Sequence, residues 1–404
     1  MTACAWKVGL VAGLLVVGAG LSGPDVVAAS ADDCRAERMV TEVLATENTD
    51  EGSSSGGFER SGDEDPTGRD LYMQACAACH GADGTGAPPS QRGFETPIPD
   101  FTDCNFASRE PDADWVAVAH EGGPVRGFSR MMPAFGEALT VEELQKVMDY
   151  VRTLCGSEAW PRGELNLPRP LVTEKAYPED EAVLSSAIDA EGSGAVMNEL
   201  VYEKRYGVRG QLEVVVPFGW LERGEGDWTQ PRFGDVAMGW KHVLSHGLES
   251  GHILSFTGEV IWPTGAAASG FGGGTMVLEP FLSYGQLLPA GSFLHAQSGT
   301  EIPLDQEAGE NEAFLRAAFG KSVARGRWGR TFSPMVEVLA SGELESGAPI
   351  HWDLVPQMQV TLNTRQHVMA NVGVRLPMDG SGRDPQVMVY LLWDWFDGGF
   401  LEGW

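Results

Sequence analysis

Two cysteines and a histidine at fixed spacing offer the clearest chemistry in the chain. Cys76 and Cys79 are two residues apart, and His80 follows directly. Two thiols about one helical turn apart can add to the two vinyl groups of one porphyrin, and the next histidine then lies under the iron as proximal ligand. A redox dithiol needs no such histidine, and a zinc site needs a second cysteine pair that this sequence lacks. The run therefore predicts covalent attachment of one haem c.

A methionine further along the chain is the expected second axial ligand of the iron. Met132 stands in a Met-Pro turn with Pro133, followed by Phe135. A thioether is a soft ligand for the sixth position, and ligation by histidine and methionine raises the reduction potential. Met131 is the neighbouring alternative. His120 would give a bis-histidine iron, but it precedes a Gly-Gly turn, where we expect a surface position.

These two elements together resemble the class I cytochromes c. The resemblance rests on the C-x-x-C-H run ending at His80 and on the Met-Pro-x-Phe element beginning at Met132. It implies an all-α haem domain, here residues 67–156, whose first and last helices cross beside the haem. Thr140 and Glu143 have the spacing of a capping box and predict where the last helix begins. Its apolar residues recur at helical spacing: Leu144, Val147, Met148, Val151 and Leu154.

The charge of the chain restricts its partners. Lys and Arg total 28 and Asp and Glu total 57, so the net charge is −29. Nucleic acid requires a basic face, which argues against a nucleic-acid partner. A periplasmic redox partner with a basic surface would instead be attracted.

The N-terminal region predicts export. Residues 1–31 have the pattern of a signal peptide, with Lys7, an apolar run at 9–21 and an Ala-Ser-Ala cleavage site at 29–31. Residues 32–66 are acidic and poor in aromatic side chains, which predicts a disordered tail. We therefore expect a mature protein outside the cytoplasmic membrane, in the periplasm and outer membrane of a Gram-negative bacterium.

The cysteine count leaves one further pairing to consider. Cys4 lies in the signal peptide, so the mature chain keeps five cysteines, two of which belong to the haem motif. Cys104 and Cys155 lie in the same domain and could form a disulfide in an oxidising compartment, or remain two buried thiols. Cys34, in the tail, would then be unpaired.

The second half of the chain changes to a period of two. After a Pro-containing linker at 157–194, residues 195–404 contain runs of about ten residues in which apolar and polar side chains alternate. One such run carries Leu212, Val214 and Val216 on one face. The opposite face of these runs carries charges: Glu213, Asp235, Lys241, Glu259, Glu279, Asp353 and Arg375. This pattern predicts an antiparallel transmembrane β-barrel of ten to twelve strands, in contact with outer-membrane lipid. A soluble sandwich or lipocalin-like barrel, with the opposite sense, is the alternative.

Three short motifs add a second resemblance. A Gly-Asp pair at 234–235, a Pro-Thr-Gly turn at 263–265 and a glycine-rich loop at 270–274 resemble the outer-membrane transporter family associated with phenol-degradation gene clusters. The similarity spans residues 233–303. The final Trp404 is typical of outer-membrane barrels, although glycines interrupt the segment before it.

These patterns predict an electron-transfer protein with no substrate-converting site. The haem domain would act in the periplasm and the barrel would anchor it at the outer membrane. A domain of about 90 residues is about 25 Å across, too wide for the lumen of so small a barrel. The alternative function is a pore for small solutes with an accessory or sensing haem.

Overall fold

The computed structural model describes residues 65–190, 194–224 and 226–395. These residues belong to one compact unit. The predicted signal peptide, most of the acidic tail, Cys34 and Trp404 lie outside the described residues. Within the described ranges, no helix combines the length and the apolar character that a membrane crossing requires.

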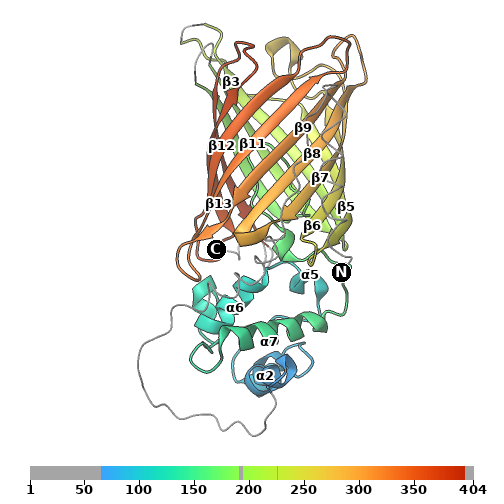
Figure 1. Ribbon diagram of the computed structural model, residues 1–404. Helices are drawn as coiled ribbons and strands as arrows, with labels where there is room; N and C mark the ends of the chain where they lie inside the picture. The colour runs from blue at the N-terminus through green and yellow to red at the C-terminus, as the bar shows by residue number, and fades with distance from the viewer. Residues whose placement is uncertain (1–64, 191–193, 225, 396–404) are drawn as a thin grey trace, which may run out of the picture. The chain divides into compact units, whose positions relative to one another are not determined.

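Twelve long antiparallel strands close into a barrel (Figure 1). The strands are β1 (Glu181–Asp189), β2 (Ala195–Tyr206), β3 (Gly210–Leu221), β5 (Val236–Gly247), β6 (His252–Trp262), β7 (Val277–Leu287), β8 (Ser292–Pro303), β9 (Glu312–Lys321), β11 (Thr331–Glu343), β12 (His351–Thr361), β13 (Val368–Pro377) and β14 (Gln386–Asp394). Two short strands, β4 (Arg232–Phe233) and β10 (Val323–Ala324), pair with β3 and β11. Each long strand pairs with the next, and β14 closes the ring on β1 with Asp394 opposite Glu181. The strand number lies within the predicted range.

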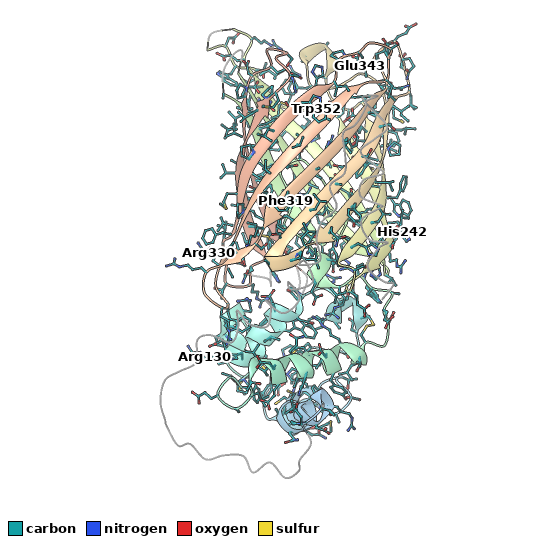
Figure 2. The ribbon with its side chains drawn as sticks, in the orientation of Figure 1. Arg130, His242, Phe319, Arg330, Glu343 and Trp352 are labelled. Atoms are coloured by element: carbon teal, nitrogen blue, oxygen red, sulfur yellow. A yellow bond between two sulfur atoms is a disulfide. The ribbon has the colours of Figure 1, made fainter. Side chains whose placement is uncertain are left out.

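The barrel is apolar outside and polar inside. Leu212 is 53% exposed, and Phe319, which Figure 2 shows on the outer wall, is 50% exposed. The polar neighbours of Leu212 in the sequence, Gln211 and Glu213, are buried on the inner face. A soluble barrel has the opposite arrangement, with its apolar residues inside. The strands are therefore of the outer-membrane type, as the alternation predicted.

The two ends of the barrel differ in their connections. The connections 207–209, 248–251 and 288–291 are short and lie at one end, which we name the short-turn end. The connections 222–235 and 263–276 are longer and lie at the other, the long-loop end. The chain enters β1 and leaves β14 at the short-turn end, because the beginning of β1 pairs with the end of β14.

The expected linker at 157–194 is corrected by the structure. After the short helix η3 (Gly163–Leu165), residues 165–180 contact the inner face of the barrel, and β1 then forms its first strand. We name residues 165–180 the luminal segment. Its contacts involve strands around the whole ring, β2, β3, β6, β8, β11, β13 and β14, which is possible only from inside. Its polar groups can be buried there because the wall supplies their partners.

Residues 65–156 form helices around a small core. The helices are α2 (Gly68–Ala75), α3 (Ala77–His80), α4 (Pro89–Arg92), α5 (Cys104–Ala107), α6 (Asp112–Glu121), η2 (Gly123–Arg126) and α7 (Val141–Leu154). The predicted capping box is present, since Thr140 accepts from the Glu143 amide and Glu143 accepts from the Thr140 amide. Helices α2 and α7 pack closely at Gly68, where a Cβ atom would lie 1.9 Å from the Lys146 carbonyl oxygen.

Candidate functional site

The C-x-x-C-H run lies where two helices meet. Cys76 ends α2, and the single turn of α3 carries Cys79 and His80. The amides of Cys79 and His80 both donate to the Cys76 carbonyl, at 3.1 and 2.9 Å, so this run is one helical turn. Tyr72 is fully buried, and its hydroxyl donates to the Gly81 carbonyl at 2.7 Å, which fixes the end of the turn. Both cysteines are free thiols, as thioether formation requires.

His80 presents a neutral imidazole. Burial lowers the pKa of His80 to about 4, so the ring is uncharged at neutral pH, the form in which histidine binds a metal. The Nδ1 atom is buried without a hydrogen-bond partner. Phe101 stacks on the imidazole with ring centroids 4.8 Å apart and restricts its orientation. An uncharged and oriented ring fits the chemistry of an axial ligand.

The methionine loop is held by backbone contacts to the end of α6. The Gly123 amide donates to the Met132 carbonyl at 3.0 Å, and the Phe135 amide donates to the Ala119 carbonyl at 3.0 Å. Met132 is half-buried against the helical core, whereas Met131 is 49% exposed. The environment of these two side chains therefore favours Met132 as a ligand.

His120 is engaged elsewhere. Its Nδ1 lies 2.8 Å from a carboxylate oxygen of Glu121, and its ring lies 6.0 Å from the ring of Trp328. A Cβ atom added at Gly136 would lie 2.5 Å from the same imidazole, so the ring is closely covered on that side. These contacts disfavour His120 as an iron ligand.

One core brings the two predicted halves of the haem site together. Cys76 and Met132 both pack against the same cluster, as do Phe101 and Trp115. Its buried members are Leu71, Tyr72, Val116, Ala119, Leu144, Val147, Met148 and Val151. Residues 56 positions apart in the sequence therefore border one apolar environment, of the kind that a porphyrin occupies.

The other two described cysteines are bonded to each other. Cys104 begins α5 and Cys155 follows α7, and their sulfur atoms form a disulfide across a Cα–Cα distance of 4.9 Å. The bond links helix α5 to the end of helix α7. It leaves Cys76 and Cys79 as the free thiols among the described cysteines.

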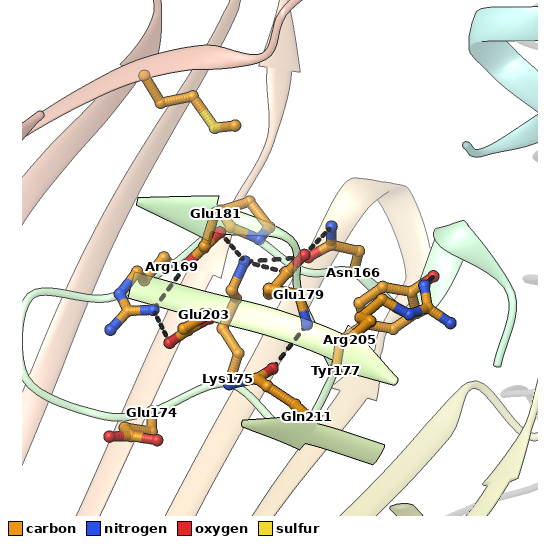
Figure 3. Close-up of polar contacts among 12 residues, drawn as sticks. Asn166, Arg169, Glu174, Lys175, Tyr177, Glu179, Glu181, Glu203, Arg205 and Gln211 are labelled. Carbon is orange, nitrogen blue, oxygen red and sulfur yellow. Dashed lines mark hydrogen bonds and ion pairs between the residues drawn. The ribbon is translucent and has the colours of Figure 1, made fainter. Parts of the chain in front are cut away.

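The barrel lumen contains a second polar site that the sequence analysis did not identify (Figure 3). Arg169, in the luminal segment, contacts Glu181 at 2.7 Å and Glu203 at 3.0 Å. Lys175 pairs with Glu179 and with Glu181. Lys175 and the three glutamates are buried and Arg169 is largely buried, so each charge is compensated by a partner rather than by water. The available signal was the concentration of charges in the supposed linker, Glu174, Lys175, Glu179, Asp180 and Glu181.

One wall carboxylate holds the middle of the luminal segment. Glu337, on β11, is fully buried and accepts from the amides of Leu171, Val172 and Thr173 at 2.9, 3.1 and 2.7 Å. It also accepts from the Thr173 hydroxyl at 2.6 Å and from Gln357 at 2.5 Å. The segment therefore crosses the lumen as a fixed element.

Polar contacts also join the helical residues to the short-turn end. Arg109 pairs with Asp180 at 2.5 Å, and Glu110 lies 2.8 Å from His367. Arg126 donates to the Trp328 carbonyl at 2.8 Å. Trp328 and His367 lie in two loops of the barrel, and Asp180 lies just before β1. These two loops and the start of β1 thus form one contact surface for the helical residues.

Comparison with known proteins identifies the helical part. A family described as cytochrome c oxidase, cbb3-type, subunit III, matches residues 63–151, a range that contains the C-x-x-C-H run and Met132. A cytochrome c-type domain is therefore present. No curated protein matches the chain.

Solved structures match the barrel. An outer-membrane channel from Pseudomonas putida F1 is 13% identical, with a TM-score of 0.42, and the match covers 56% of this chain and all of that one. The KdgM porin is 9% identical, with a TM-score of 0.36, covering 53% and 99%. The NanC porin is 8% identical, with a TM-score of 0.37, covering 53% and 98%. Likenesses of this size carry no information on what this chain binds or transports.

Proposed function

We propose that this protein is a one-electron carrier, with one covalently bound haem c in the periplasm and a barrel that anchors it in the outer membrane. The observation that carries the proposal is the C-x-x-C-H turn itself. It lies inside the range matched by the cytochrome family, with both thiols free and the imidazole neutral and unpaired. When bound, the haem supplies the one-electron chemistry of its iron.

The residues of this chain have separate roles around that group. Cys76 and Cys79 would hold the porphyrin through two thioethers. His80 would be the proximal ligand, oriented by Phe101, and Met132 the distal ligand, held by the backbone contacts of its loop. A methionine in this position raises the reduction potential relative to a second histidine.

The lumen favours an anchor over a solute pore. A barrel of twelve strands is narrower than the barrels of about sixteen to eighteen strands that leave an open aqueous channel. The luminal segment occupies this space and pairs with strands around the ring. The occupied lumen therefore argues against free passage of solutes through the barrel.

The connections of the barrel support the periplasmic side for the haem domain. In outer-membrane barrels the short turns face the periplasm and the longer loops face outward. The chain reaches β1 at the short-turn end, so residues 65–156 precede the barrel on that side. With a net charge of −29, the protein should attract a basic redox partner there.

The test compares two adjacent methionines. Met132→Ala should abolish the weak absorption band of sulfur–iron ligation and lower the reduction potential. Met131→Ala, the matched control at an exposed position, should retain both. Loss of the band in the Met131 variant alone would contradict the assignment, and persistence of the band in both variants would exclude methionine ligation by either residue.

A further inference from the structure

Three glutamates meet inside the barrel without enough positive charge. Glu174 comes from the luminal segment, Glu213 from β3 and Glu259 from β6. One carboxylate oxygen of each lies within 4.8 Å of the others. Glu213 lies 39 positions after Glu174 and 46 positions before Glu259 in the chain, yet the three carboxyl groups share one small volume.

The central carboxylate is buried and unsatisfied. Glu213 is 5% exposed, and its Oε2 atom has no hydrogen-bond partner among the described residues. An unpaired buried carboxylate oxygen is unfavourable unless a cation or a donor occupies the remaining position. The Glu174 Oε2 atom likewise has no hydrogen-bond partner among the described residues.

The neighbouring cations do not neutralise the cluster. Lys241 is buried and lies 3.7 Å from Glu174, so the three carboxyl groups share one ammonium partner. The other luminal cations have carboxylate partners of their own. Arg169 pairs with Glu181 and Glu203, and Lys175 pairs with Glu179 and Glu181.

The wall leaves room where the carboxylates converge. Gly239, on β5, lies between Glu213 and Glu259 and pairs with both. A Cβ atom at this position would lie 3.1 Å from the Glu259 Cγ and 3.4 Å from the Glu213 Cβ. Because glycine has no side chain, the space beside Gly239 is left for the side chains of Glu213 and Glu259.

We propose that Glu174, Glu213 and Glu259 bind one divalent metal cation of the calcium type. Carboxylate oxygens are the ligands that hard cations prefer, and two oxygens on opposite sides of a calcium ion are about 4.6–5.2 Å apart. The ion would give these buried carboxyl groups a cation partner and tie the luminal segment to β3 and β6. The site is independent of the haem proposal, because it uses barrel and luminal residues alone.

Further glutamates provide an entry route for the cation. Glu259 lies opposite Glu279 on β7, and Glu301 on β8 lies opposite Glu312 on β9. Glu312 lies opposite Glu343 on β11, which Figure 2 shows near the long-loop end. The row becomes less buried toward Glu343, which is exposed. A cation can therefore reach the buried site along an acidic surface.

The test uses the full-length, haem-loaded protein, purified in detergent without lipopolysaccharide. Bound metal ions are first removed with a chelator. Calorimetric titration with Ca²⁺ should show one saturable site that binds Mg²⁺ more weakly. Glu213→Gln should weaken Ca²⁺ binding at least tenfold. Glu345→Gln, which removes an equal charge at an exposed position outside this row of glutamates, should change the affinity less than threefold. Equal binding by the native protein and Glu213→Gln, or no saturable binding at all, would overturn the site.

A second readout separates metal binding from a general folding defect. In chelator, Glu213→Gln should unfold at the same temperature as the native protein or higher, because it removes one of three repelling carboxylates. In Ca²⁺ the native protein alone should become more stable. Glu174→Gln, in the luminal segment rather than a strand, should reproduce both results. Equal Ca²⁺-dependent stabilisation of all three proteins would contradict the proposal.

Discussion

Removal of the Glu337 side chain should release the luminal segment while leaving the barrel closed. In Glu337→Ala, the amides of Val172 and Thr173 and the Thr173 hydroxyl lose their acceptor, whereas the Leu171 amide keeps the Gln357 side-chain oxygen at 3.0 Å. The strand pairs on either side of Glu337 involve backbone atoms and should persist.

The size of the effect follows from the number of donors left unpaired. An unsatisfied buried donor costs roughly 1–3 kcal/mol. Three donors at the lower limit give about 3 kcal/mol, because water entering the lumen would compensate part of the loss. A difference of about 1.4 kcal/mol is tenfold in an equilibrium constant, so the open state of the segment should become about a hundredfold more populated.

Hydrogen–deuterium exchange measures this directly. Peptides covering residues 165–180 should lose about two orders of magnitude of amide protection in Glu337→Ala, while peptides from β5 to β8 should keep theirs. Glu343→Ala, on the same strand but exposed, is the control and should exchange like the native protein. The reasoning is refuted if the luminal peptides stay protected in Glu337→Ala, or if they exchange freely in the native protein.

Three further outcomes are expected. Thiol labelling of denatured, unreduced mature protein should leave Cys104 and Cys155 unmodified, and labelling at both positions would remove the disulfide. The protein should fractionate with the outer membrane and change its mobility on unboiled gels after heating; recovery in the soluble periplasmic fraction would contradict the barrel as a membrane anchor. A membrane-impermeant reductant added to intact cells should reduce the haem slowly in the absence of a soluble mediator, and rapid reduction would instead support electron passage through the barrel.

Local patterns in the sequence predicted the haem-motif turn and the barrel wall. The spacing of Cys76, Cys79 and His80 is complete within one helical turn, so no distant residue is needed to recognise it. The alternation of apolar and polar residues likewise reports which face of each strand meets lipid. Both features depend on neighbours in sequence.

The luminal segment could not be recognised in the same way. Its partners lie far along the chain, as with Thr173 and Glu337, which are 164 residues apart. Prolines and charges in residues 157–180 are also typical of exposed linkers, and only the polar inner wall makes their burial favourable. For this reason the barrel begins earlier than the predicted boundary at residue 195, because β1 begins at Glu181.

The glycine-rich motifs have a structural explanation. The Asp235 carboxylate accepts from the Gly265 amide at 2.8 Å and from the Gly273 amide at 2.7 Å. A single aspartate thus joins the Gly-Asp pair, the Pro-Thr-Gly turn and the glycine-rich loop at the long-loop end. These contacts account for the motifs as a loop-fixing arrangement, and membership of the transporter family stays a prediction.

The most direct test of the central claim is a potentiometric titration of the purified full-length protein, followed by denaturation in acid and solvent. We predict one haem per chain, a single one-electron transition and haem that stays with the polypeptide after denaturation through Cys76 and Cys79. Haem that extracts freely, or a protein that shows no reversible one-electron transition, would contradict the account.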